Sequence, residues 1–531
     1  MPTLEWIGKD KVVNHHQEVP YRVLERQYGY DEAGQHAEDN GSENMIIHGD
    51  NLEALKALLP RYEGKVKCIY IDPPYNTGNE GWVYNDNVND PKIKRWLGEV
   101  VGKEGEDLSR HDKWLCMMYP RLKLLQRLLA EDGAIFISID DVEFYNLRLI
   151  CNEIFGDHNF IATIIWRKNY APKGTAKHFS EDHDYILVYG KSAEQWIPHK
   201  MPRTEKQNKA YKNPDNDPRG LWRPNNLAAR NFYSKGTYSI TCPSGRVIKG
   251  PPAGSYWRVS EEKFWEMDRD GRIWWGKDGN NVPAPKIFLS EVADGVVPQT
   301  FWSYEEVGHT QDAKKEIKTI FTGETPFDTP KPVRLIERIL QIASDPDSII
   351  LDSFAGSGTT AHAVLNMNKA DGGNRKFILV EMMDYADSIT AERVKRVIDG
   401  YGEDKKAVEG TGGNFSYYEL GPVLLLPDGN LNEEVGPQKI REYVYYMETK
   451  EPLPAEQPTD EPYFMGLCRN TAYYFYYERE SVTTLDHAFL ATVQTKAEGY
   501  TIYADLCAIP QETLRKHNIT FKKIPRDIAR L

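Results

Sequence analysis

The sequence predicts an α/β fold with a Rossmann-like sheet, an inserted domain and a small C-terminal α/β domain. Two regular stretches alternate short apolar segments with amphipathic helical patterns, as in a mainly parallel sheet. In the second stretch, one strand leads through a glycine-rich turn into a helix, and the next strand ends in an acid. The residues between the two stretches lack this alternation and are rich in Gly, Pro and Asn.

We divide the 531 residues into five parts on this pattern. Residues 1–43 are an N-terminal extension, and residues 44–190 and 325–400 are the two halves of the core. Residues 191–324 are the inserted domain, and residues 401–531 the C-terminal domain. The extension gives weak signals: a helical piece around residues 20–27 fits its pattern, and residues 31–44 read as a loop.

The first half of the core predicts strands that alternate with helices. Leucines recur on one face after the first strand and again in a longer helix, which is the periodicity of buried helices. In chain order, the expected strands and helices are Met45–Asp50, Asn51–Leu59 (helix), Val66–Ile71, Lys113–Ala130 (helix), Ala134–Ile139, Val142–Phe155 (helix), Phe160–Trp166 and Tyr185–Val188.

Composition restricts the class of protein. No run approaches the ~18 apolar residues of a membrane-spanning helix, and the start lacks the basic and apolar regions of a signal peptide. The six cysteines are far apart, without a Cys-x-x-Cys pair. This spacing argues against a zinc ribbon and a disulfide framework, so we expect no metal site and a cytoplasmic location.

The turn Asp72-Pro73-Pro74-Tyr75 organises the first half. It follows an apolar strand, and its two prolines end that strand in a stiff turn without N–H donors. A carboxylate, a carbonyl with few competing donors and an aromatic ring can together hold a planar exocyclic amine and stack on its ring. A rigid surface turn without function is the alternative.

Two further features of this half have open interpretations. The long polar stretch 76–111 is either a lid that closes over a ligand or a disordered segment. The pair Asp140-Asp141 ends a strand, where acids serve as metal ligands, as a general base or as helix caps; we favour capping.

The inserted domain carries basic residues next to aromatic ones. Residues 166–280 contain 21 Lys and Arg against 13 Asp and Glu, although the whole chain has a net charge of −13. Arginine and aromatic side chains together contact phosphates, stack on bases and read guanine edges. The candidate DNA-binding residues are Trp166, Lys168, Arg223, Arg230, Arg258 and Arg272. A β-rich domain with an aromatic core and a solvated basic face is compatible with the same pattern.

The second half of the core predicts a cofactor site. After a helix that starts at Thr329–Pro332 and a strand at Ser348–Leu351, the turn Asp352 to Thr359 leads into the helix Ala361–Met367. The strand Lys376–Val380 then ends at Glu381, an acid placed to bind ribose hydroxyls. The turn fits neither Gly-x-Gly-x-x-Gly nor a phosphate-binding loop. A shorter loop suits a carboxylate rather than a pyrophosphate, and this points to S-adenosylmethionine.

The C-terminal domain shows no catalytic constellation. A Pro/Glu-rich linker at residues 451–462 precedes a last α/β unit with segments at 473–477, 489–495 and 502–506. We interpret this part as an interaction module; an extension of the core is the alternative.

The motifs together resemble the β group of amino-methylating DNA methyltransferases, in particular the modification (Mod) subunits of type III restriction–modification systems. The matching segments are His48–Asn51, Asp72–Gly78, Lys113–Leu129, Asp132–Asp141, Ile164–Lys168, Thr329–Pro332 and Phe354–Thr359. In that group the catalytic turn precedes the cofactor loop, and the recognition region lies between them. The resemblance implies a methyltransferase core of permuted motif order, DNA as substrate, a homodimer and a nuclease or helicase restriction subunit as partner.

The resemblance also implies a role for each motif residue. Asp72 and the Pro73 carbonyl would accept the hydrogens of the target amine while Tyr75 stacks on the flipped base. Lys331 would lie near the cofactor carboxylate, Glu381 would bind the ribose and Asp50 the adenine amine. The cofactor-binding residues expected in total are Asp50, Lys331, Asp352, Phe354, Ala355, Gly356, Ser357, Gly358, Thr359 and Glu381.

The expected reaction is methylation of adenine N6, because enzymes of this group that act on cytosine N4 more often carry Ser in place of Asp72. Cytosine N4 methylation stays open as an alternative. So do a recognition-only subunit of a restriction complex and a nucleotide-dependent oxidoreductase, although the missing third glycine argues against the last.

Overall fold

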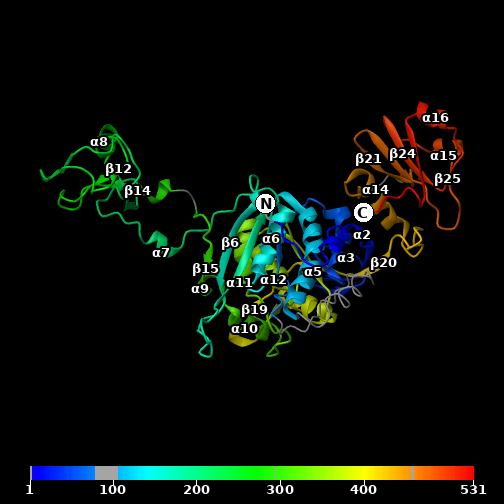
Figure 1. Ribbon diagram of the computed structural model, residues 1–531, viewed down its shortest axis with the longest axis horizontal. Coiled ribbons are helices and arrows are strands. Elements are labelled where there is room, and N and C mark those ends of the chain that lie inside the picture. The colour runs from blue at the N-terminus through cyan, green and yellow to red at the C-terminus, as the bar shows by residue number, and fades with distance from the viewer. Residues whose placement is uncertain (1–2, 78–105, 293–294, 456–459, 531) are drawn as a thin grey trace. The chain divides into compact units, whose positions relative to one another are not determined.

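The computed structural model describes residues 3–77, 106–292, 295–455 and 460–530. These separate into two compact units, and residues 199–298 form the second of them, here called the insert (Figure 1). The first unit comprises the rest of the chain and is here called the core unit. Most of the expected lid at residues 76–111 lies outside the described residues.

A mixed sheet of eleven strands forms the centre of the core unit, in the order β15-β6-β7-β5-β4-β16-β17-β3-β20-β1-β2. The strands between β5 and β20 in this order run parallel, whereas β7 and β1 are antiparallel to their neighbours. Their bounds are β1 Arg22–Asp31, β2 Gly34–His36, β3 Met45–His48, β4 Val66–Ile71, β5 Leu129–Ile139, β6 Phe160–Arg167, β7 His183–Gly190, β15 Phe301–Trp302, β16 Ile349–Asp352, β17 Lys376–Glu381 and β20 Asn414–Val423.

Helices cover both faces of this sheet. A large apolar cluster joins the sheet to side chains of α3, α5 and α6. The β16–α12–β17 connection runs along the sheet in the opposite direction from β4–α5–β5, so α12 covers the other face if both crossovers are right-handed. The helices of the core are α1 Lys9–Val12, α2 His15–Glu18, α3 Asn51–Tyr62, α5 Glu106–Leu128, α6 Phe144–Phe155, α9 Tyr304–Val307, α10 Thr310–Ile320, α11 Val333–Ala343, α12 Thr359–Asp371 and α13 Glu392–Asp399.

The strands and helices predicted for both halves of the core are present, but the N-terminal extension differs from its prediction. Of residues 20–27, which fit a helical pattern, residues 22–27 belong instead to strand β1, a strand of ten residues that pairs with β20. An edge strand of mixed polarity carries a weak local pattern, and its partner lies about 390 residues away in sequence. The pairing, and not the local propensity, therefore determines its conformation.

The domain boundaries also move. The insert is narrower than the expected 191–324, because β15, α9 and α10 return to the core, where β15 pairs with β6. The core extends past residue 400, because β20 lies beside β3 in the sheet.

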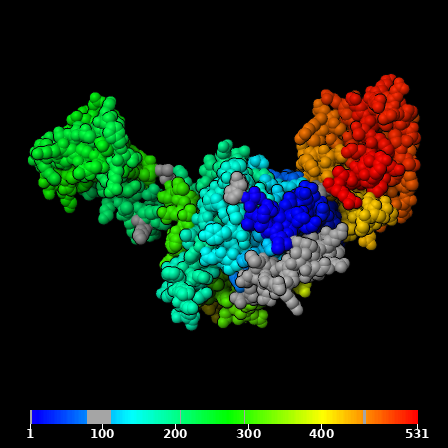
Figure 2. Space-filling view, in the orientation of Figure 1, coloured from blue at the N-terminus to red at the C-terminus, as the bar shows by residue number. Residues whose placement is uncertain are grey.

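The insert is a small β-rich body with its own apolar core (green in Figures 1 and 2). Leu227, Ile240, Trp257, Phe264 and Ile273 are its buried centre. Its elements are α7 Glu205–Asn208, β8 Trp222–Pro224, β9 Ala228–Ala229, β10 Ile240–Thr241, β11 Val247–Ile248, β12 Tyr256–Trp257, α8 Glu261–Arg269, β13 Ile273–Trp274 and β14 Ala284–Phe288.

The two ends of the insert are neighbours. Met201 and Val296 form an antiparallel bridge in which each N–H donates to the other's carbonyl at 2.8 Å. The chain therefore enters and leaves the insert at one point.

The C-terminal region continues from β20 into α14, whose buried side chains share an apolar cluster with Val23 of β1. A four-stranded sheet of order β21-β22-β24-β26 follows, as the prediction of a last α/β unit required. Its elements are α14 Pro437–Thr449, β21 Phe464–Cys468, β22 Thr471–Phe475, β23 Thr484–Leu485, α15 His487–Leu490, β24 Gly499–Ala504, β25 Leu506–Cys507, α16 Gln511–Lys516 and β26 Ile519–Lys523. None of the helices in the described part of the chain combines the length and apolar character that a bilayer crossing demands.

Candidate active site

A cavity of about 590 Å³ lies at the carboxyl ends of β4 and β16. These strands are parallel neighbours, with Cys68 opposite Ile350 and Ile69 opposite Leu351. The connections from the two strands leave in opposite directions along the sheet, and such a switch point leaves a crevice for a ligand. The turn after β4 and the turn after β16 thus face one cavity, although about 280 residues separate them in sequence.

The cavity brings most of the predicted site residues together. Those that line it are Asp72, Pro73, Pro74, Tyr75, Trp166, Lys168, Lys331, Asp352, Phe354, Ala355, Gly356, Ser357 and Thr359. Three predicted cofactor residues, Asp50, Gly358 and Glu381, are not among the lining residues, and the four arginines Arg223, Arg230, Arg258 and Arg272 belong to the insert.

The turn at residues 72–75 is held by side chains from other elements. The indole Nε1 of Trp114 donates to the Pro74 carbonyl at 2.7 Å. The next residue, Asn76, has a φ of 59°, which Asn tolerates better than most residues, and its amide donates to the buried Glu143 at 2.5 Å. These contacts fix the direction in which the turn leaves the strand.

Acceptor atoms remain available on this turn. Asp72 Oδ1 is buried without a hydrogen-bond partner among the described residues. Among the residues that the structure describes, no group donates a hydrogen bond to the Pro73 carbonyl. A buried acceptor without a donor is costly, so its persistence suggests a ligand that supplies the donor. Burial, with the charge of Asp72, raises the pKa of Tyr75 well above its ordinary value, so this ring stays neutral.

Lys331 lies against this turn. Its ammonium contacts Asp72 Oδ2 and lies 5.2 Å from the centroid of the Tyr75 ring. Lys331 therefore bridges the two groups that the sequence assigned to the target base.

A second buried carboxylate lines the cavity, and sequence reasoning missed it. Asp184, on β7, is paired with Lys168 at 2.5 Å. Burial raises the pKa of Asp184, and the neighbouring Lys168 and Lys331 oppose that rise. An acid within an otherwise apolar strand was the signal in the sequence.

The glycine loop, residues 353–358, is bonded closely to the strands beside it. Asp352 accepts from the Phe354 N–H at 3.0 Å and from the Thr360 hydroxyl at 2.6 Å. Glu381 accepts from the Gly356 N–H at 2.7 Å, so its carboxylate holds the loop from the neighbouring strand β17.

The two glycines of the loop are required by its geometry. Gly356 and Gly358 have φ of 51° and 78°. A Cβ on Gly356 would lie 3.0 Å from the Phe327 ring, and one on Gly358 would lie 3.0 Å from the Thr390 carbonyl oxygen. The sequence pattern gave no indication of Phe327, which lines the cavity with Tyr385.

Arg393, also missed from sequence, supports the loop from behind. This fully buried guanidinium donates to the Ser357 hydroxyl at 3.0 Å and to the Thr359 hydroxyl at 2.8 Å. Burial lowers the pKa of Arg393 to about 10. It therefore remains charged at neutral pH.

Two predicted acids have local structural partners. Asp50 accepts from the Leu52 and Glu53 N–H groups as the N-cap of α3 and pairs with Arg121 at 3.3 Å. Asp140 accepts from the Val142 N–H at 3.0 Å and so closes the turn before α6, whose N-cap is Glu143. Asp140 is thus a turn residue and not the helix cap that we favoured.

The buried Asp352 predicts a pH dependence of stability. Burial raises the pKa of Asp352 to about 7, from about 4 in an unfolded chain. Between these values the folded state binds more protons, so raising the pH lowers the free energy of unfolding. Asp352→Asn removes this effect. We compare the free energies of unfolding of the variant and the parent in urea titrations. The value for the variant minus the value for the parent should rise by about 2–3 kcal/mol between pH 5 and pH 8. The same difference at both pH values would contradict the prediction.

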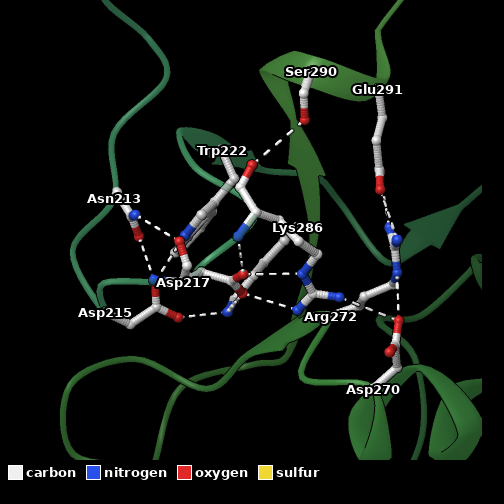
Figure 3. Close-up of polar contacts among 10 residues, drawn as sticks. Asn213, Asp215, Asp217, Trp222, Asp270, Arg272, Lys286, Ser290 and Glu291 are labelled. Atoms are coloured by element: carbon white, nitrogen blue, oxygen red, sulfur yellow. Dashed lines mark hydrogen bonds and ion pairs between the residues drawn. The ribbon is translucent and has the colours of Figure 1, made fainter.

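The arginines of the insert fall into two groups. Figure 3 shows Arg272 between Asp270 and Glu291, which it meets at 2.6 Å each, within a network of charged side chains around Lys286. Arg223 is exposed and donates to the Tyr211 hydroxyl at 3.1 Å. Arg230 and Arg258 are exposed, and their side chains have no partner among the described residues.

Comparisons with known proteins agree with this geometry. Residues 66–392 match the family described as DNA methylase (N6_N4_Mtase), which is more than half of the chain. Over 424 residues the chain is 35% identical to the type III restriction-modification enzyme StyLTI Mod subunit of Salmonella typhimurium strain LT2. That match covers 74% of this chain and 62% of the relative.

Two further relatives have similar identity. The type III restriction-modification enzyme EcoPI Mod subunit of Escherichia phage P1 is 33% identical, over 71% of this chain and 63% of its own length. The type II methyltransferase M.KpnI of Klebsiella pneumoniae is 32% identical, over 65% of this chain and 81% of its own length. The matches to the two Mod subunits thus span less than two thirds of those proteins.

Proposed function

This chain belongs to the DNA methylase family, and from that premise we propose that it transfers a methyl group from S-adenosylmethionine to N6 of a flipped adenine in DNA. The observation that carries the proposal is that the turns after β4 and β16 share one cavity. It combines the acceptors of Asp72 and Pro73 with the glycine loop.

The residues of the cavity suit S-adenosylmethionine. Its volume of about 590 Å³ falls within the ~300–1,000 Å³ usual for small-molecule sites. A Cβ on Gly356 would meet the Phe327 ring, so the glycine keeps the space between the loop and this ring open. Phe327 and Tyr385 offer ring surfaces beside the loop. Lys331 supplies a cation for the amino-acid carboxylate. We assign the residues from Phe354 to Thr359 to the methionine part of the cofactor. Glu381 and Asp50 are not among the lining residues, and we assign them to the ribose and the adenine on their sequence motifs alone.

When bound, this cofactor supplies an electrophilic methyl group on a sulfonium. The protein has to make the adenine amine a better nucleophile, because its lone pair is delocalised into the ring. Asp72 and the Pro73 carbonyl each accept one hydrogen of the amine. They draw these hydrogens out of the ring plane, so the lone pair can point toward the methyl group.

The ring and the proton also need partners on the protein. Tyr75 stacks on the adenine and compensates for part of the unstacking, which costs a few kcal/mol. When the new N–C bond forms, the amine must lose one proton. The carboxylate of Asp72 is the acceptor already bonded to it.

The test is a methylation assay with purified protein, labelled S-adenosylmethionine and unmethylated duplex DNA, followed by nucleoside analysis. We expect N6-methyladenine at one short recurring sequence. N4-methylcytosine instead would overturn the assignment of the base. Cofactor binding without transfer to any DNA would favour a recognition-only subunit.

We further propose that the insert reads the DNA, that Trp166 and Lys168 contact the base or its flanking strand, and that the chain works as a homodimer with a restriction subunit. The insert carries the exposed arginines, whereas Trp166 and Lys168 line the cavity. The relatives are named as Mod subunits of restriction-modification enzymes, and these names support the proposal of a restriction subunit as partner. Light scattering of the purified chain, alone and with a candidate nuclease subunit, tests both assemblies.

The arginines of the insert provide a prediction with a matched control. Arg258 is exposed and unpartnered in the described structure, so it is free to meet a phosphate. Arg258→Ala should weaken DNA binding about 3–10-fold and reduce the slope of log K against log salt by about 0.9.

Arg272→Ala is the control, because its guanidinium is already neutralised by Asp270 and Glu291. We expect it to lower the melting temperature and to leave the salt slope unchanged. Fluorescence anisotropy over a range of salt concentrations measures both variants. If Arg272→Ala reduces the salt slope and Arg258→Ala does not, the DNA binds the surface around Arg272 and its charged network instead.

A further inference from the structure

The ammonium of Lys331 occupies the place where the target amine should bind. It contacts Asp72 Oδ2 and lies 5.2 Å from the Tyr75 ring, so it covers both a hydrogen-bond acceptor and the stacking face. The side chain is only 12% exposed. An adenine cannot bind to these groups while the ammonium is there.

The backbone of Lys331 is restrained, whereas its side chain can move. Pro330 and Pro332 restrict φ on both sides of it. Its carbonyl accepts from the Thr359 hydroxyl at 3.3 Å, at the start of α12 and the end of the glycine loop. The four-carbon stem is flexible, and it begins beside the loop that we assign to the cofactor.

The charges around the cavity decide where the ammonium lies. In the described structure its direct anionic partner is Asp72, and the buried Asp184 adds a second negative charge nearby. Asp184 itself already forms an ion pair with Lys168, at 2.5 Å. A carboxylate placed at the glycine loop would therefore compete with Asp72 for Lys331.

We propose that Lys331 is a positioning residue that closes the base slot until the carboxylate of the cofactor draws it away, so that cofactor binding precedes capture of the adenine. The inference rests on the proposed function and adds an order of binding to it. Lys331 pairs with Asp72 in the free protein and with the cofactor carboxylate in the complex. Its departure exposes Asp72 Oδ2 and the Tyr75 ring together.

The first test is calorimetry without DNA. S-adenosylhomocysteine keeps the carboxylate, whereas 5′-methylthioadenosine lacks it. Asp72→Asn frees Lys331 in advance, so we expect it to bind S-adenosylhomocysteine about 3–5-fold more tightly than the parent and 5′-methylthioadenosine equally well. In a Lys331→Met background the same change should have no effect on either ligand. A side chain with a purely structural role would not produce this selective gain.

Lys173→Met is the matched control, since this exposed lysine lines the same cavity and leaves the pair of Lys168 with Asp184 intact. The gain from Asp72→Asn should persist in that background. Unchanged or weaker binding of S-adenosylhomocysteine by a folded Asp72→Asn protein overturns the proposal. Equal melting temperatures establish the fold of each variant.

The second test follows the base with 2-aminopurine at the target position of the mapped recognition sequence. The parent should show increased fluorescence with S-adenosylhomocysteine and at least about tenfold less base capture with 5′-methylthioadenosine or no ligand. Lys331→Met should capture the base without any ligand. Equal capture by the parent in all three conditions overturns the order of binding while leaving the methyl transfer intact. Absence of methyl transfer by the parent overturns the proposed function itself.

Discussion

Asp72→Ala is expected to abolish methyl transfer, lowering kcat by at least about 10³-fold, while the protein still binds S-adenosylhomocysteine at least as well as the parent. In the proposed mechanism the carboxylate accepts a hydrogen bond from the target amine and polarises it as the reaction proceeds, and the loss of one such preorganised group costs about 10²–10³-fold. In the same mechanism Asp72 also accepts the released proton, which adds to the loss. Single-turnover assays with labelled cofactor, beside calorimetry, measure the two properties separately.

Asp141→Ala is the control for this prediction. Asp141 follows the adjacent strand β5 but is exposed and does not line the cavity. We expect its kcat to stay within about twofold of the parent. Loss of cofactor binding together with transfer in Asp72→Ala would instead indicate that Asp72 maintains the structure of the cavity.

Arg393→Met is expected to destabilise the core by about 3–5 kcal/mol, the cost of removing one partner from a buried charged network. The guanidinium is fully buried and bonds Ser357, Thr359 and His362. Its removal leaves these groups without their hydrogen-bond donor and takes a positive charge away from the half-buried Glu316. Because the loop loses its support, cofactor affinity should fall as well. Urea titration followed by tryptophan fluorescence, with calorimetry below the transition, measures both effects.

Arg396→Met is the matched control on the same helix. Its side chain is one-third exposed and pairs with Glu392 at 2.7 Å, so its loss should cost at most about 1 kcal/mol. Arg393→Lys should recover part of the stability, because an ammonium can replace some of the hydrogen bonds. Equal stability of Arg393→Met and Arg396→Met would contradict the role given to Arg393.

The sequence predicted those parts of the site that are encoded in one short segment each. Two prolines after an apolar strand identify the turn at Asp72, and a glycine turn between a strand and a helix identifies the loop at Gly356. Both predictions needed only local rules of backbone geometry. The α/β order of the core followed from hydrophobic periodicity for the same reason.

What the sequence could not predict depends on the meeting of distant segments. Asp184 and Phe327 line the cavity, and Arg393 bonds the glycine loop from behind. They come from three separate segments, and no local pattern separates them from ordinary polar or apolar residues. Strand β1 is defined by a partner far away in sequence. The borders of the insert were misplaced, since irregular sequence precedes β15, a strand of two residues.

The bridge between Met201 and Val296 bears on how the insert can be exchanged during evolution. Because the chain enters and leaves the insert at one point, residues 199–298 can be exchanged as a cassette at two adjacent junctions. Neither junction interrupts the parallel strands β4 and β16 or their turns. With the role proposed for the insert, recombination at these junctions changes the target sequence in one step and leaves the chemistry of the cavity as it was.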